Sequence, residues 1–299
     1  MIRRYVTLDV FTDRVFGGNP LAVVLDCEGL SSVHMQSIAS EFNYSETTFI
    51  LPARKAQHTA QVRIFTPRVE VPFAGHPNIG TAVGLARELE REGRAPTDEF
   101  LFEETAGIVR VRLQRESGRI IGAELTAPEA LSVGSSLSAQ EVARCLSLAA
   151  GDIDTTRHPP QVVSVGLPFL AVRLASRDAL RRAKPDLATH ERLLPPLRTD
   201  AIFAYVPGPE AGRLQARMFA PLDGCLEDPA TGSATAATIA LLASLDGKSD
   251  SHLAWQVEQG VDMGRPSLLL GRTEKRAGMV RAVHVGGQAV EVMRGTFSQ

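Results

Sequence analysis

RIFTP at residues 63–67 and HPNIGTA at residues 76–82 return later in the chain as RMFAP at residues 217–221 and DPATGSA at residues 228–234. Further partial matches follow the same order along the chain: Pro20 with Pro168, Glu46 with Asp200, Phe49 with Phe203, and Glu104 with Glu258. An ordered series of this kind indicates an internal duplication. We therefore expect two related domains that share one order of strands and one central helix each.

The segment around the second motif predicts how each half is built. The uncharged stretch from Pro229 to Leu245 is too short, and too rich in Gly, Ser and Thr, to span a bilayer. A helix that is apolar on every side must be covered on every side, and its neighbouring segments resemble short strands. The predicted fold class is α+β, with two pseudo-symmetric domains that each wrap a mostly antiparallel sheet around a central helix.

The predicted domain boundary lies near the middle of the chain. Residues 1–127 are expected to form the N-terminal half, with the strand-like tail 283–299 as a candidate to complete it, and residues 128–282 the C-terminal half. The segment 127–137 and the helical stretch SAQEVARCLSLAA at residues 138–150 form the expected crossover.

Composition restricts the class of partner. The chain is 44% hydrophobic and 22% charged with a net charge of -2, which is typical of a soluble globular protein. Because there is no basic run, neither nucleic acid nor a membrane surface is an expected partner. The N-terminus lacks the apolar stretch of a signal peptide, so a cytoplasmic location is the default expectation.

Cofactor and metal signatures are missing from the sequence. The three cysteines, Cys27, Cys145 and Cys225, are far apart and predict neither a disulfide framework nor a metal site. The histidines show no metal-ligand spacing, no phosphate-binding glycine fingerprint is complete, and none of the four lysines has a convincing catalytic setting. We therefore expect no metal and no cofactor.

Each predicted central helix begins with a polar residue and a proline, His76-Pro77 in one half and Asp228-Pro229 in the other. This pattern is typical of a capped first turn. Helix N-termini attract anions, and Gly75, Gly232 and Ser233 would allow close approach and donate hydrogen bonds. The alternative is that Asp228 only caps its helix and that the glycines only permit close packing, which for one helix alone is the commoner case.

Two further side chains are candidates for chemistry. Glu46 is flanked by Phe42, Tyr44 and Phe49, an apolar setting that raises a carboxyl pKa toward the range useful for proton transfer. The competing interpretation is a solvated glutamate at the entrance of a strand. Cys225 is either a nucleophile near a helix N-terminus or a small buried residue, and the second is the commoner case.

Taken together, the motifs resemble a known family. FTDRVFGGNPLAVVL (11–25), SETTF (45–49), PFAGHPNIGTA (72–82), DPATGSA (228–234) and EQGVDMGRPS (258–267) resemble the PhzF-like isomerases of phenazine biosynthesis, within the diaminopimelate epimerase-like superfamily. The resemblance implies a duplicated, cofactor-free fold with the active site between its halves. It implies that Glu46 is the general acid/base, and that His76, Asp228, Gly75, Gly232 and Ser233 occupy the other active-site positions.

The resemblance also implies a reaction and leaves alternatives. In the phenazine enzyme a proton moves between ring carbons of trans-2,3-dihydro-3-hydroxyanthranilate. The related epimerases use two cysteines, where this chain has Gly75-His76 and Asp228, so two-thiol chemistry is disfavoured. We expect a small carboxylate as partner and a homodimer as the candidate assembly. An amino-acid epimerase or racemase, including one that uses Cys225, and a non-catalytic binding protein of the same fold remain alternatives.

Overall fold

A computed structural model describes residues 2–298. The chain forms two compact units: unit 1 runs to Thr126 and is completed by the chain from Gly286 onward, and unit 2 is Ala127–Val285. Within these described residues, no helix is long and apolar enough to cross a bilayer.

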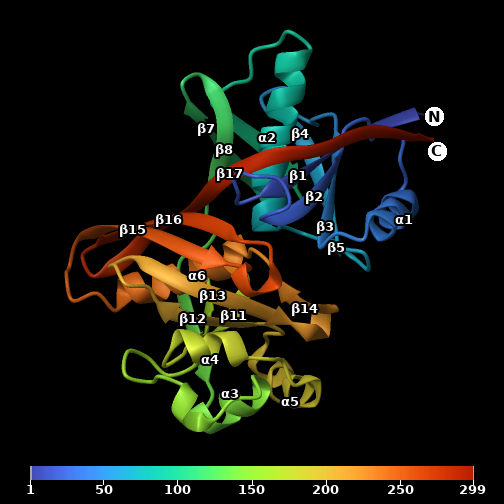
Figure 1. Cartoon of the computed structure of the whole chain (residues 1–299). Coiled ribbons are helices and arrows are strands. Elements are labelled where there is room, and N and C mark those ends of the chain that lie inside the picture. The colour runs from blue at the N-terminus through green and yellow to red at the C-terminus, as the bar shows by residue number, and fades with distance from the viewer. Residues whose placement is uncertain (1, 299) are drawn as a thin grey trace. The chain divides into compact units, whose positions relative to one another are not determined.

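Unit 1 contains eight strands of its own, the last part of β17 and two helices, and Figure 1 labels them except for β6. Their bounds are β1 (Ile2–Val10), β2 (Asn19–Val24), α1 (Ser32–Phe42), β3 (Glu46–Leu51), β4 (Ala60–Phe65), β5 (Glu70–Val71), α2 (Gly75–Arg91), β6 (Glu99–Glu104), β7 (Gly107–Glu116), β8 (Arg119–Thr126) and β17 (Met279–Ser298). The helix α2 contacts β1, β2, β3, β7 and β8, and its residues from Gly75 to Gly84 are all buried.

Unit 2 contains the remaining elements. Their bounds are β9 (Ser132–Ser136), α3 (Ala139–Cys145), β10 (Gln161–Ser164), β11 (Pro168–Arg173), α4 (Arg177–Arg182), α5 (Leu187–Leu193), β12 (Ile202–Pro207), β13 (Arg213–Ala220), β14 (Cys225–Asp228), α6 (Gly232–Ser244), β15 (Ser251–Gln259) and β16 (Ser267–Arg276). The helix α6 contacts β10, β11, β15 and β16. Its first turns carry no acidic or basic side chain, because nearly every position is buried.

Strand pairing follows the same order in both units. In unit 1, β2 is parallel to β3, β3 antiparallel to β4, β4 parallel to β6, and β6 antiparallel to β7. In unit 2, β11 is parallel to β12, β12 antiparallel to β13, β13 parallel to β15, and β15 antiparallel to β16. This shared order supports the duplication that the repeated motifs predict.

The arginines of the repeated motif make equivalent contacts. In unit 1, the Arg63 guanidinium pairs with Glu70 and lies 5.1 Å from the centre of the Phe65 ring. In unit 2, Arg217 pairs with Glu227 and lies 4.8 Å from the Phe219 ring. The alternation of a strand places residues i and i+2 on one face, so each RxF motif presents its cation over its own aromatic ring.

The register corrects two of the sequence matches by one residue. With Arg63 matched to Arg217, the partner of Arg63 across the sheet is Phe49, and the partner of Arg217 is Ala204. Phe49 therefore corresponds to Ala204 rather than Phe203. By the same count Glu46 corresponds to the buried Ala201, and the match with Asp200 is wrong.

A third sequence match, in the strands that follow the central motif, is also wrong by one residue. Ala60 pairs with Phe102, and the matching Leu214 pairs with Val257. Counting two residues along each strand makes Glu104 the counterpart of Gln259, not of Glu258. A one-residue slip moves a side chain to the opposite face of the strand, so this difference changes which side chain faces the central helix.

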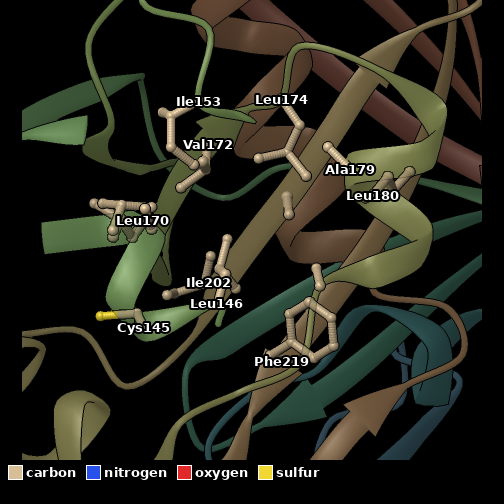
Figure 2. Packing of buried hydrophobic residues seen from close by; sticks show 14 of the residues in the cluster. Cys145, Leu146, Ile153, Leu170, Val172, Leu174, Ala179, Leu180, Ile202 and Phe219 are labelled. Carbon is tan, nitrogen blue, oxygen red and sulfur yellow. The ribbon is translucent and has the colours of Figure 1, made fainter. Parts of the chain in front are cut away.

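Each unit contains a further core outside its central helix. In unit 1, α1 packs through its Met35 against Val24, Phe49 and Phe65. In unit 2, α3 and α4 cover apolar residues of β10–β12, and Figure 2 shows this cluster with Leu170, Val172, Ile202 and Phe219 among its members.

Candidate active site

Glu46 is the first residue of β3, where it pairs with Leu21 of the parallel strand β2. It shares a face of β3 with Thr48, whose hydroxyl lies 2.8 Å from the Thr81 hydroxyl on α2. Phe49 lies on the opposite face, in the core beneath α1, and Phe42 packs against Tyr5. The predicted apolar setting from Phe42 and Phe49 is therefore wrong: Glu46 lies on the α2 side of the strand.

His76 lies opposite Glu46, in the first turn of α2. Its Nε2 is 3.5 Å from Glu46 Oε2, and the imidazole is 6% exposed while the carboxyl side chain is 19% exposed. Burial lowers the pKa of His76 to about 3. The ring is therefore neutral at physiological pH and acts as a hydrogen-bond donor or acceptor rather than as a cation.

A residue that the sequence reasoning did not single out orients this imidazole. The fully buried Asn19 places its Nδ2 3.4 Å from His76 Nδ1, and its Oδ1 accepts a 2.9 Å hydrogen bond from the Ser45 hydroxyl. An amide nitrogen donates only, so His76 Nδ1 accepts and its proton resides on Nε2, the atom that faces Glu46. The Asn-Pro pair in FTDRVFGGNPLAVVL was the available signal, because an asparagine at the start of a buried strand needs polar partners.

Helix capping differs from the sequence prediction in both units. The helix α2 begins at Gly75 after Ala74, so His76 and Pro77 lie inside its first turn. The helix α6 begins only at Gly232, after Thr231, and neither helix has a side-chain cap. The expectation that Asp228 caps α6 is wrong.

Asp228 ends β14 instead, paired with Met218 of β13. The Thr231 hydroxyl donates to its Oδ2. Gln259, fully buried, donates from Nε2 to the Asp228 carbonyl at 2.8 Å and accepts from the Thr231 N–H at 3.1 Å. These hydrogen bonds hold residues 228–231 in an extended form, which explains why α6 starts later than the motif suggests.

The predicted glycine and serine positions lie at the two helix starts. Gly75 and Gly232 are the first residues of α2 and α6 and are buried, and the half-buried Ser233 is the second residue of α6. Backbone N–H groups in a first helical turn have no intrahelical acceptor. Each helix start therefore supplies donors to a bound anion.

The remaining reactive groups fit less well. The Cys225 thiol is half-buried and donates to the Glu227 carbonyl at 3.3 Å. Over residues 2–298, no three His, Cys, Asp or Glu side chains are grouped closely enough to hold a metal ion.

Comparison with known proteins shows the family to which this chain belongs. The model of the phenazine biosynthesis-like proteins matches residues 8–295. An uncharacterized isomerase of Mesorhizobium japonicum is 37% identical, with 98% of each chain covered, and a trans-2,3-dihydro-3-hydroxyanthranilate isomerase of Pseudomonas chlororaphis is 36% identical, with 99% of each covered. A PhzF-family structure from Bacillus anthracis covers all of both chains with a TM-score of 0.86 at 24% identity. The family resemblance and the two-domain architecture are confirmed, and the wrapping of each sheet around its central helix stays a prediction.

Proposed function

The chain belongs to the phenazine biosynthesis-like protein family and is an isomerase, and from this premise we propose that it moves a proton on a small carboxylate substrate without a cofactor. The first candidate substrate is trans-2,3-dihydro-3-hydroxyanthranilate, which three relatives that are 34–36% identical have in their names. The observation that carries the proposal is the 3.5 Å approach of Glu46 Oε2 to the neutral imidazole of His76.

Glu46 is the proposed general acid/base. Its ionised carboxylate removes a proton from one carbon of the substrate, and the C–H electron pair passes into the adjacent conjugated system. The resulting carboxylic acid then returns the proton to another carbon, so the carboxylate is regenerated and no other reactant is consumed. Ala201 stands at the matching position of the second half, so one carboxyl, not a symmetric pair, does this work.

His76 is the proposed partner of that carboxyl. With its proton on Nε2, the neutral imidazole donates toward Glu46 or toward a polar substituent of the substrate, and it stabilises developing negative charge without itself changing protonation state. Asp228 is proposed to hold a second polar substituent. Gly75 in unit 1, and Gly232 and Ser233 in unit 2, are proposed substrate-binding positions, because the first helical turns there have free donors.

Replacing Glu46 by Gln tests the acid/base assignment. The amide keeps the size of the side chain but cannot take up the proton, so we expect kcat to fall by about 10² to 10⁴ with a small change in affinity. The assay follows product formation from trans-2,3-dihydro-3-hydroxyanthranilate and, in deuterated water, exchange into a panel of cyclic and amino-acid carboxylates.

Two control variants make that result interpretable. Glu41→Gln changes an exposed glutamate on α1 and should leave kcat unchanged. Cys225→Ala should also leave it nearly unchanged. A Glu46→Gln enzyme with wild-type turnover, together with an inactive Cys225→Ala enzyme, would replace the carboxyl mechanism by thiol chemistry. Exchange into an amino acid alone would favour the epimerase alternative.

A further inference from the structure

Glu104 is a buried acid that the proposed reaction does not use. It ends β6, and both of its carboxyl oxygens are inaccessible to solvent and without a hydrogen-bond partner of ordinary geometry. A buried carboxylate in that condition is costly, whereas a neutral carboxylic acid is tolerated.

The duplication shows what the same position does in the other half. Gln259, the counterpart of Glu104 by strand register, is fully buried and binds the segment that leads into α6. Its amide donates to the Asp228 carbonyl and the Thr231 hydroxyl, and accepts from the Thr231 N–H. The position therefore holds a neutral side chain with both a donor and an acceptor.

The neighbours of Glu104 in unit 1 differ from those of Gln259. The Asn78 side chain on α2 faces its carboxyl. The Asn78 amide donates to the Ala74 carbonyl at 3.0 Å, while its Oδ1 has no hydrogen-bond partner. Just beyond Glu104, the Ala106 N–H donates to the Pro72 carbonyl, which ties the end of β6 to the segment before α2.

Charged groups on the adjoining elements are engaged elsewhere. Glu103 points to the other face of β6 and pairs with His58, and Arg63 on β4 pairs with Glu70. Arg110 on β7 pairs with Glu99, and Arg112 on the same strand is exposed. On α2, His76 is neutral. Within residues 2–298, burial and the Asn78 amide account for the state of Glu104, and no cation compensates its charge.

We propose that Glu104 is a positioning residue that keeps its proton in the active enzyme, so that the end of β6 stays against the segment that leads into α2 and its His76 is held in place. Loss of that proton leaves a charge on carboxyl oxygens that are buried and have no hydrogen-bond partner. The inference concerns how the site is held and rests on the proposed function only for its kinetic readout.

The acid strength of the group agrees with this geometry. Burial raises the pKa of Glu104 from the usual 4.5 to about 8, against a smaller opposite effect of the Asn78 amide. Because the folded pKa lies above the unfolded one, the folded protein holds the extra proton between these values. Its stability from this group is full at pH below 4.5 and decreases as the pH rises through this window.

The direct test is the ionisation of Glu104 itself. In protein labelled with ¹³C at the glutamate carboxyl carbon, we expect one signal that titrates near pH 8 and disappears in Glu104→Gln. Should the amide variant not fold, loss of that signal in Glu104→Met makes the same assignment. If every glutamate carboxyl titrates below pH 6, the proposal is wrong, whatever the enzyme turns over.

The kinetic and stability tests use the amide as a permanent mimic of the protonated acid. The wild-type kcat should fall about tenfold per pH unit above the pKa of Glu104, while Glu104→Gln keeps its neutral-pH kcat to higher pH. The melting temperature of Glu104→Gln relative to wild type should rise between pH 4.5 and 8 and then level off. Glu99→Gln, at an exposed position of the same strand, should do neither.

The outcomes separate the two proposals. A titration near pH 8 without turnover of any tested carboxylate contradicts the proposed function and leaves the protonated Glu104 standing. An alkaline loss of kcat that persists unchanged in Glu104→Gln contradicts the positioning role, even where the reaction itself is confirmed.

Discussion

At the scale of single residues, the candidate site depends on side chains that hold other side chains. Asn19 contributes no chemistry, but it decides which nitrogen of His76 carries the proton. The Ser45 hydroxyl in turn donates to the Asn19 amide oxygen. Ser45 directly precedes Glu46 in the chain, so these hydrogen bonds connect His76 to the backbone beside the proposed acid/base.

Replacing Asn19 by Asp should reverse the tautomer of His76. A carboxylate accepts a hydrogen bond from an Nδ1–H group, so Nε2 would then face Glu46 without a hydrogen. The two acceptors would repel each other. We expect kcat to fall by about 10² through this misorientation. The ¹⁵N shifts of the imidazole report the tautomer directly, and Ser37→Ala on α1 is a control that should change neither. Unchanged shifts in Asn19→Asp would contradict the assignment.

At the scale of elements, the two halves use the same motif with different supports. The Arg217 guanidinium is 11% exposed, pairs with Glu227, and donates to the Leu180 and Ala183 carbonyls around the end of α4. Arg63 is 21% exposed and pairs with Glu70 and the Ser32 hydroxyl. A cation at a helix C-terminus satisfies carbonyls that have no intrahelical donor.

Removing the two arginines should therefore have unequal effects. We expect Arg217→Ala to lower the free energy of unfolding of its unit by about 3 kcal/mol, because it removes a donor from Glu227 and from the Leu180, Arg181 and Ala183 carbonyls. Arg63→Ala, at the more exposed pair, should cost about 1 kcal/mol. Urea unfolding followed by the fluorescence of Trp255, the single tryptophan, reports unit 2, and hydrogen exchange in β3 and β4 reports unit 1. Equal losses would contradict this ranking.

At the scale of the whole molecule, unit 1 is built from both ends of the chain. The strand β1 pairs with β2 on one side and with the last part of β17 on the other, from Val10 with Ala289 to Ile2 with Ser298 (Figure 1). Glu291 and Arg294 of β17 also form ion pairs with Arg91 and Glu88 of α2. The central helix of unit 1 thus depends on residues two hundred positions later.

Ending the chain after Val285 should therefore affect unit 1 selectively. The truncation exposes one edge of β1 and removes both ion pairs to α2. We expect amides in β1 and in the last turns of α2 to lose hydrogen-exchange protection, while amides of β12 and β13 keep theirs. Undiminished protection in β1 would contradict the role assigned to β17.

The duplication, the α+β class and the family were readable from the sequence because local motifs carry them. RIFTP and RMFAP keep an arginine and a phenylalanine two positions apart, and a strand turns that spacing into one shared face wherever it lies. Glu46 and His76 stood out as candidates for the same reason, as members of compact motifs.

The strand register and the hydrogen bonds were decided only by the tertiary structure. Sequence matching made Glu258 the counterpart of Glu104, but the strand register makes Gln259 its counterpart. A slip of one residue reverses the face of a strand. Likewise, Asp228 looks like a helix cap until β13 and Gln259 engage its backbone. Motifs are local, whereas the pairing of distant strands and the burial of a carboxyl depend on residues that only folding brings together.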